Sequence, residues 1–452
     1  MRNPVLPLHR SRRQREYFLP PLSARIIRPC IVSFLFITLL TFLAAFSSRH
    51  CFWCSTGGCP WPKSPTSWSA PISIRAVPSA SWSFLHGKEG ERDAVLHVQN
   101  LCSSPEHGVF YVDSPELASK SIPAVNVVAS APELDKLWSP AKLSKQQLSS
   151  PCFRYLSNTT LFVMGTIWNH HMSHYYINNG MPLLDVMRSY FKDWKFAGDW
   201  MQTKRHLAVT AGGNNFFEAI NIFKFEEMYS AQPEQRAEDD ASSTAITCYA
   251  NAVIGLNSTC AHNFCKNQHA DKHIYKFLHK LVWQQYLTAA DAKKAIAIEQ
   301  GQVTQRQHAV IVQRKHNRHM VNIDAMAASF TKYGISNEIV HLENMSYRDQ
   351  VRLFALKATV IVGVHGNAIA HFLWSQRNTL VIEVFQLDWH SDWQELILKQ
   401  MAKAEPAHAT DIRYAKIECK DQSCSEGLSG LNANVKVNIT ALDSIIESHL
   451  VS

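Results

Sequence analysis

Two arginines in the second half of the chain have the setting of a phosphate-binding site. Arg314 and Arg318 follow residues 309–313, an apolar segment with the pattern of a buried strand. A guanidinium is always charged, and its forked N–H donors fit phosphate oxygens. Ligands of parallel sheets bind at the carboxyl ends of strands. The pair therefore fits an anionic ligand that carries phosphate. The alternative is a solvated basic loop, because residues 315–319 are polar throughout.

A second segment offers groups for the same ligand. His365, Gly366 and Asn367 follow the apolar, largely β-branched run 359–364. A glycine lets a ligand approach the backbone, and a helix that begins there would direct free N–H groups toward an anion. Glu383 lies in the next apolar run, where a carboxylate near a strand end can accept hydrogen bonds from ribose hydroxyls. The alternatives are an ordinary turn and a carboxylate that faces water.

Histidine and amide side chains crowd the end of an earlier predicted strand, residues 160–167. They are Asn169, His170, His171 and His174. His170 and His174 are four residues apart and would share one face of a helix. This is weak evidence for a metal site, because the central glutamate of zinc proteases is absent. A nicotinamide site is disfavoured, since no G-x-G-x-x-G follows a predicted strand.

The elements that would position these groups alternate between strand and helix in the second half of the chain. The expected strands are residues 309–313, 338–342, 359–364 and 380–385. The expected helices are residues 321–333, 346–357, 368–374 and 389–402. Such alternation predicts a parallel, doubly wound sheet. The first half is less regular, with expected strands at 160–167 and 207–211, a segment expected in the core at 248–256, and expected helices from 181 to 190 and from 273 to 294.

The amino-terminal residues predict a membrane anchor. Residues 1–28 hold seven arginines and one acid, Glu16, and residues 29–48 run for 20 residues without a charge. That length suits one membrane-spanning helix, and the arginines before it would keep the leader cytoplasmic and the rest lumenal. The leader supplies +6 of the formal net charge of +8 (seven arginines minus one glutamate). The net charge is therefore a topology signal and gives no reason to expect a nucleic-acid partner.

Sequons and cysteines fit a lumenal body. The N-x-S/T sequons all follow the predicted span, at Asn158, Asn257, Asn344 and Asn438. In an oxidising compartment, neighbouring cysteines are expected to form disulfides. The candidate pairs are Cys260 with Cys265, Cys419 with Cys424 and, at longer range, Cys152 with Cys248.

Composition and length divide the rest of the chain. Residues 49–101 predict a partly disordered stem, because residues 61–78 are rich in Pro, Ser and Trp and show no periodicity. The remaining length suits two domains. The expected boundaries are residues 102–300 for the first domain, 301–402 for the second and 403–452 for a tail that ends in a helix.

The order and spacing of residues in the second domain resemble glycosyltransferase family 61. The family pattern is a strand followed by Arg, Arg and Asn, then a helix with Gln, a strand, Gly-x-His-Gly and a strand that ends in Glu. The corresponding residues here are Arg314, Arg318, Asn322, Gln350, Gly363, His365, Gly366 and Glu383. Residues 248–256 also resemble a family block. The family contains xylan arabinosyl- and xylosyltransferases and protein-glycan N-acetylglucosaminyltransferases.

The resemblance implies an α/β fold of the GT-B type, a pair of Rossmann-like domains behind the anchor and stem. Residues 102–300 would form the acceptor-side domain and residues 301–402 the nucleotide-sugar-binding domain. The residues that the resemblance implies for the nucleotide sugar are Arg314, Arg318, Asn322, His365, Gly366, Asn367 and Glu383, and the two arginines would bind its diphosphate without a metal ion. The implied activity is inverting transfer of xylose, arabinose or N-acetylglucosamine from a nucleotide sugar, UDP-linked in the first instance, to a glycan or glycoprotein. We expect no cofactor and no obligatory divalent metal, since no Asp-x-Asp triplet occurs. The expected location is the Golgi membrane as a single-pass type II protein, with the endoplasmic reticulum as second choice.

The general base departs from the family pattern. The family has a histidine and, four residues later, an acid before a proline; aligned on Pro182, this chain has His174 and Asn178. An inverting transfer needs a base for the acceptor hydroxyl, and an asparagine cannot serve. His174 is the first candidate and Asp185 the second. The alternative is a catalytically inactive lumenal glycan-binding or scaffold protein with the same fold.

Overall fold

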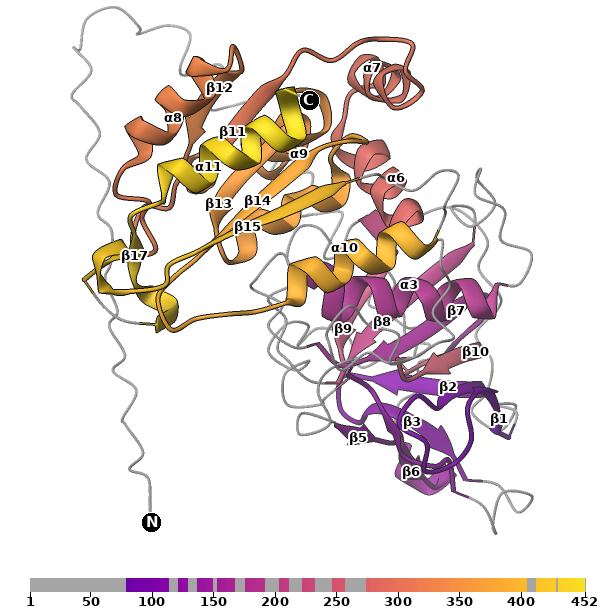
Figure 1. Cartoon of the computed structure of the whole chain (residues 1–452). Helices are drawn as coiled ribbons and strands as arrows, with labels where there is room; N and C mark the ends of the chain where they lie inside the picture. Colours follow the sequence, from indigo (N-terminus) through magenta and orange to yellow (C-terminus); the bar gives the residue numbers. More distant parts are fainter. Residues whose placement is uncertain are drawn as a thin grey trace, which may run out of the picture. The chain divides into compact units, whose positions relative to one another are not determined.

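The computed structural model is built around two large β-sheets (Figure 1). The structure describes residues 79–113, 121–128, 136–148, 153–166, 175–191, 203–210, 222–231, 246–256, 274–404, 412–427 and 430–451. Both sheets belong to one compact unit, residues 61–452. The predicted leader and anchor, residues 1–48, lie outside the described residues. Within the described part of the chain, no helix is long and apolar enough to cross a membrane.

The second half of the chain folds into a five-stranded sheet in the order β12-β11-β13-β14-β15. Its strands are β11 (His308–Val312), β12 (Ser336–Val340), β13 (Val360–Val364), β14 (Leu380–Phe385) and β15 (Arg413–Glu418). Every neighbouring pair is parallel. All residues of β11, β13 and β14 are buried, as continuous Val and Ile runs between two helical layers require. The predicted parallel sheet is confirmed.

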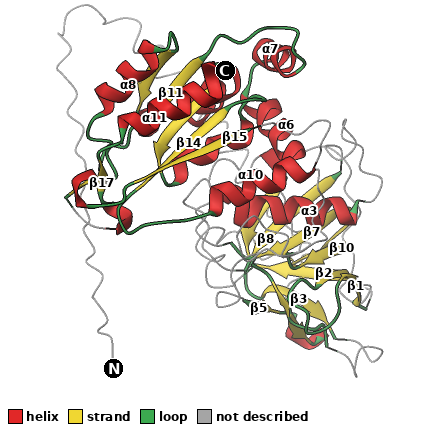
Figure 2. Cartoon of the chain, viewed as in Figure 1, coloured by secondary structure: helices red, strands yellow, loops and turns green. Residues whose placement is uncertain are grey.

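Helices cover both faces of this sheet (Figures 1 and 2). One face packs against α8 (Ile323–Lys332) and α11 (Ile439–Ile446), around Phe330 and Leu442. The other packs against α9 (Tyr347–Leu356) and the 3-10 helix η8 (Asn367–Trp374), around Phe354 and Trp374. The amide of Asp349 donates to the hydroxyl of Ser346 over 3.2 Å, which is the cap expected at the start of α9. The remaining short helices here are η7 (Leu342–Asn344), η9 (Gln422–Cys424), η10 (Gly430–Asn432) and η11 (Glu447–Val451), and α10 spans Trp393–Ala404.

The predicted helix 273–294 is two helices. α6 (Ile274–Tyr286) ends before Thr288, and α7 (Ala289–Glu299) begins after it. The hydroxyl of Thr288 accepts a hydrogen bond from the amide of Asp291 over 3.1 Å, so this threonine caps a second helix instead of continuing the first.

The first half of the chain folds into an eight-stranded mixed sheet in the order β6-β3-β2-β10-β7-β8-β9, with β1 paired to β2. The strands are β1 (Ser81–His86), β2 (Val95–Ser104), β3 (Gly108–Val112), β6 (Ala141–Leu143), β7 (Phe153–Met164), β8 (Lys204–Val209), β9 (Glu227–Ser230) and β10 (Ile246–Ile254). β10, β7, β8 and β9 are mutually parallel, whereas β1, β2 and β3 pair antiparallel. The helix predicted at residues 181–190 is α3 (Met181–Tyr190), which follows the π-helical η5 (Tyr175–Gly180) and packs on this sheet. This half of the chain also contains η4 (Lys145–Gln147) and a separate two-stranded sheet of β4 (Val125–Asn126) and β5 (Leu137–Trp138).

Two predicted boundaries are corrected by the sheets. Residues 81–101, assigned to the stem, form β1 and most of β2, and the apolar side chains of β2 lie in the core. Residues 403–452, assigned to a tail, supply β15, the hairpin of β16 (Ser425–Glu426) and β17 (Asn434–Val435), and α11. Both segments lack a long periodic run, and their place is decided by pairing with strands far away in the sequence.

Two disulfides cross-link the described residues. Cys419 pairs with Cys424, as predicted. Cys248 pairs with Cys102 and not with Cys152, because β2 and β10 are neighbours and place Cys102 directly opposite Cys248. The expected pair of Cys260 and Cys265 lies outside the described residues.

Candidate functional site

The strand order of the five-stranded sheet creates a switch point between β11 and β13. From β11 the chain passes to β12 on one side, and then to β13, β14 and β15 on the other. In doubly wound sheets, ligands bind beyond the carboxyl ends of the strands at such a point. Arg314 and Arg318 follow β11, and His365 and Gly366 follow β13. The structure therefore brings together four of the predicted site residues at this edge.

Both arginine side chains converge on Gly366. Nη1 of Arg318 donates to the backbone oxygen of His365 over 3.0 Å. A Cβ atom placed on Gly366 would lie 2.8 Å from Nη1 of Arg318 and 3.2 Å from Nη1 of Arg314. Gly366 also has φ +147°, a conformation that is strained for any residue with a Cβ. Its lack of a side chain is therefore what admits the two guanidinium groups.

Positive charge accumulates here without full compensation. Burial, and then the positive charge of Arg314, lowers the pKa of Arg318 to about 10. Burial also lowers the pKa of Arg314, and the carboxylate of Glu343 partly offsets this effect. Nε of Arg318 is buried and has no hydrogen-bond partner among the described residues. Two adjacent half-buried cations favour an anion, and the forked donors suit phosphate oxygens.

The side chain of His365 is oriented by Glu383, which also accepts a hydrogen bond from Tyr414. Nδ1 of His365 donates to Oε1 of Glu383 over 2.7 Å, and the hydroxyl of Tyr414 donates to Oε2 over 2.7 Å. The imidazole ring also stacks on Phe385, with ring centroids 5.4 Å apart. Burial, and then the charge of Glu383, raises the pKa of Tyr414, so its hydroxyl stays protonated and donates. This arrangement fixes the orientation of the imidazole ring, and Nε2 is the ring nitrogen that is not bonded to Glu383.

Glu383 does not occupy the position predicted for a ribose-binding residue. Its side chain is 0 % exposed, and both carboxylate oxygens already accept hydrogen bonds from protein groups. It lies within β14, opposite Gly363 of β13, and not in the loops beyond the carboxyl ends of the strands. The structure assigns it to the support of His365.

Two further family-pattern residues have structural partners. The amide of Asn322 bonds to the backbone of Val437 in both directions, donating over 2.9 Å and accepting over 2.8 Å, so its predicted contact with nucleotide is not supported. The amide of Gln350 donates to the backbone oxygens of Leu342 and Met345 and so closes the turn before α9. Asn367 begins η8; its side chain lies outside the description.

The predicted catalytic residues are only partly described. His174, with Asn169, His170 and His171, lies outside the described residues. Asp185 is on α3 and is only 4 % exposed, in a helix whose neighbouring side chains belong to the core, and it has interaction partners of its own. Asn178 is 1 % exposed in η5. The burial of Asp185 argues against the prediction that it reaches an acceptor hydroxyl.

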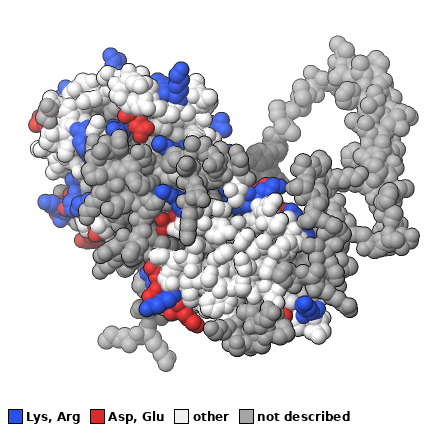
Figure 3. Space-filling model, turned by 90° about the vertical axis from the view of Figure 1, so that its right-hand side faces the viewer, with Lys and Arg blue, Asp and Glu red and all other residues white. Residues whose placement is uncertain are grey.

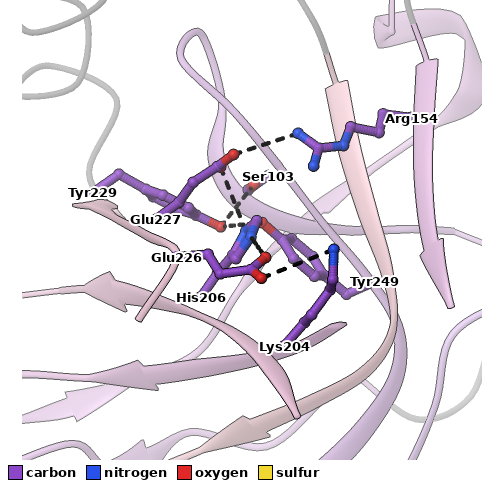
Figure 4. Close-up of polar contacts among 8 residues, drawn as sticks. All are labelled: Ser103, Arg154, Lys204, His206, Glu226, Glu227, Tyr229 and Tyr249. Carbon is purple, nitrogen blue, oxygen red and sulfur yellow. Dashed lines mark hydrogen bonds and ion pairs between the residues drawn. The ribbon is translucent and has the colours of Figure 1, made fainter. Parts of the chain in front are cut away.

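A polar cluster in the mixed sheet was not foreseen from the sequence (Figure 4). It joins Ser103, Arg154, Lys204, His206, Glu226, Glu227, Tyr229 and Tyr249. His206 is 1 % exposed; its Nδ1 lies 2.8 Å from the hydroxyl of Tyr249 and 3.4 Å from a carboxylate oxygen of Glu227. The cluster lies at the amino ends of the parallel strands β7, β8 and β9, opposite to the edge at which such sheets bind ligands. We assign it a structural role.

No sequence signal could have revealed this cluster, because its members come from segments far apart in the chain and are joined only by strand pairing.

Elsewhere on the surface the charges are mixed. Figure 3 shows lysines and arginines interspersed with acidic side chains over one face of the described residues.

Three of the predicted glycosylation sites are exposed. Asn158 lies in β7, Asn344 in η7 and Asn438 directly before α11, where its side-chain oxygen accepts from the amide of Ala441 over 3.0 Å. The hydrogen bond uses the side-chain oxygen of Asn438 and does not involve its amide nitrogen, which is the atom that carries a glycan. Asn257 lies outside the described residues.

Among curated proteins, none matches the chain. Residues 253–382 match the family model described as Glycosyltransferase 61. The matched range includes α6, α7, the strands β11 to β13 and the loops that carry Arg314, Arg318, His365 and Gly366. Through this segment the chain is similar to glycosyltransferase family 61, and the match supports membership of that family.

Proposed function

We propose that this protein is an inverting glycosyltransferase. It moves xylose, arabinose or N-acetylglucosamine from a nucleotide sugar, UDP-linked as the first candidate, to a glycan or glycoprotein acceptor. The observation that carries the proposal is the convergence of Arg314 and Arg318 on Gly366 at the switch point of the parallel sheet. A family 61 match supports transfer of a sugar in general, and the choice of sugar, donor and acceptor is part of the proposal.

The residues at the β11–β13 edge suit the leaving group of this reaction. As the bond between the sugar and the diphosphate breaks, negative charge grows on the phosphate oxygens. Arg314 and Arg318 provide fixed cationic donors for that charge, which is stabilised most when the donors need no rearrangement. His365 is pre-oriented by Glu383 and offers its Nε2 to the same edge. These groups supply positive charge without a divalent metal, which we propose is not required.

A base must take the proton from the acceptor hydroxyl as its oxygen attacks the anomeric carbon. His174 remains the first choice, since a neutral imidazole accepts a proton near its unperturbed pKa of about 6.5. It follows β7 in the sequence, and the carboxyl end of a parallel strand is where such a base is expected. His174→Ala should abolish transfer and leave nucleotide binding intact. Transfer at the wild-type rate by this variant would exclude the histidine as the base.

One observation favours a second function, a glycan-binding or scaffold protein without activity. Asn178 stands where the family pattern has an acid, and Asp185, the nearby carboxylate, is buried in the core. If His174 does not serve, no base remains among these candidates. The two functions are separated by an Asn178→Asp variant. Transfer that appears only in this variant would identify a decayed transferase.

We also propose that the protein is anchored in the Golgi membrane with its folded part in the lumen. The disulfides Cys102–Cys248 and Cys419–Cys424 support an oxidising compartment. The full chain expressed in a secretory cell should shift in gel mobility after glycosidase treatment. An unchanged mobility would contradict a lumenal location.

The nucleotide site is tested by binding. A thermal-shift panel of nucleotide sugars should reveal a stabilising donor, because a ligand of the folded state raises stability with occupancy. Arg314→Ala and Arg318→Ala should each weaken its binding by about 1.5–3 kcal/mol, the scale of a charge-assisted hydrogen bond. Lysine should restore binding only in part, because it lacks the fork. Arg348→Ala is the matched control, since Arg348 is an exposed arginine of α9. Wild-type affinity in both alanine variants would refute the site.

A further inference from the structure

The loop that carries both arginines is tied to a distant segment of the chain. We call residues 313–322 the arginine loop and residues 430–438 the C-terminal clamp. The two are joined by side-chain hydrogen bonds between residues that are 115 positions apart in the sequence, and by backbone hydrogen bonds beside them. No role was predicted for the clamp, since it lies in the segment expected to be a tail.

Two asparagines of the clamp bond to the residues on either side of Arg318. The amide of Asn317 donates to Oδ1 of Asn432 over 3.1 Å. The backbone amide of His319 donates to Oδ1 of Asn434 over 2.9 Å. These contacts fix the backbone immediately before and after the arginine.

The backbone of the clamp continues the attachment along the loop. The amide of Val435 donates to the oxygen of His319 over 2.8 Å, and the amide of Val321 donates to the oxygen of Val435 over 2.9 Å. Met320 and Val435 form a parallel bridge, so β17 pairs with the loop as a short strand would. Beyond it, Asn322 bonds in both directions to the backbone of Val437.

The clamp is itself anchored to the sheet. β17 pairs antiparallel with β16, and the amide of Lys436 donates to the oxygen of Cys424 over 2.9 Å. Cys424 is bonded to Cys419, which directly follows β15. A continuous series of covalent and hydrogen bonds therefore runs from the sheet through the clamp to the arginine loop.

Arg318 needs such support because of its backbone conformation. Its φ is +60°, in the left-handed region that residues with a Cβ adopt only at a cost. A strained residue of this kind persists where its surroundings determine its conformation. In this conformation Nη1 of Arg318 reaches the oxygen of His365 and the space over Gly366.

We propose that Asn434, Asn432 and Asn322 are positioning residues for the diphosphate of the donor, acting through Arg318. The inference rests on the proposed function, because it assigns the clamp to the same site. None of the three touches the ligand. They hold the arginine loop in the one conformation that presents the Arg318 guanidinium beside that of Arg314.

The test measures the affinity of the full chain for UDP by calorimetry, with the thermal midpoint of each variant recorded alongside. Asn434→Ala should raise the dissociation constant about tenfold, the effect of losing one hydrogen bond of ordinary strength. Asn432→Ala breaks a contact between exposed side chains, so it should fold and shift affinity in the same direction. Asn337→Ala is the control, since its amide bonds to the backbone of Ala327 away from the loop, and it should bind UDP as the wild type does.

A double-mutant cycle separates positioning from general destabilisation. In the Arg318→Ala background, Asn434→Ala should have no further effect on affinity, because the group that it positions is gone. An equal loss in both backgrounds would overturn the inference, as would wild-type affinity in folded Asn434→Ala and Asn432→Ala variants; in either case the proposed function would stand. If the wild type binds neither UDP nor any other nucleotide, the proposed function fails and the inference fails with it.

Discussion

Gly366→Ala is the sharpest test of the site, because the structure defines both of its effects. The new Cβ would lie 2.8 Å from Nη1 of Arg318 and 3.2 Å from Nη1 of Arg314. Both atoms end flexible side chains, so the guanidinium groups would move away and the protein would still fold. The hydrogen bond from Arg318 to the oxygen of His365 would then be lost.

The expected magnitudes follow from these two effects. Gly366 has φ +147° and ψ −165°, a region open essentially to glycine alone, so alanine should lower the free energy of unfolding by about 1–3 kcal/mol. Displacing Arg318 should weaken nucleotide binding by about 1.5–3 kcal/mol, the value of a charge-assisted hydrogen bond. Unfolding in urea measures the first quantity and titration calorimetry with UDP the second.

Gly334→Ala is the matched control. Gly334 has φ +71° in the same domain, and nothing lies within 4 Å of the position of an added Cβ. This variant should lose about 1 kcal/mol of stability and bind UDP with unchanged affinity. If Gly366→Ala binds UDP as tightly as the wild type, the two arginines do not form the nucleotide site and the reasoning is refuted.

Three further predictions concern buried groups. Burial lowers the pKa of both His279 and His371 to about 3, so both histidines stay neutral in the folded protein. In the unfolded chain they bind protons below about pH 6.5, so the free energy of unfolding should decrease as the pH drops. The expected decrease at pH 5.0 is about 2 kcal/mol per histidine. Urea unfolding at pH 7.5 and 5.0 should show this loss, and His371→Gln should remove about half of the difference; an unchanged difference would contradict the assignment. Glu383→Ala should lower the free energy of unfolding by about 2–4 kcal/mol, because it leaves the buried donors of His365 and Tyr414 without an acceptor. If Glu383 instead bound the ribose, the variant would lose affinity for UDP and keep the thermal midpoint of the wild type. Replacing Cys102 and Cys248 by serine should lower the free energy of unfolding by up to about 5 kcal/mol, from the entropy of a loop with sequence separation 146, and a protein of unchanged urea midpoint would exclude that contribution.

The local pattern of residues 301–402 was sufficient to predict the strands β11 to β14 and the helices α8, α9, η8 and α10. The segments around Val360 and Leu380 are continuous apolar runs, and a parallel strand buried on both faces needs nothing more specific. Ser346 and Asp349 mark the start of α9 through contacts made within one turn. The arginines and Gly366 were identified by residue type and by their place after strands, since these properties are local as well.

The tertiary structure decided which of these residues share a site and which support it. Glu383 and Asn322 match the sequence pattern of a binding site, yet the fold buries the first behind His365 and gives the second to Val437. The partner of Cys248, the strands of the supposed stem and the C-terminal clamp all depend on pairing between distant segments. A sequence specifies local conformation through nearby side chains, whereas these contacts exist only after strands far apart in the chain have paired and packed.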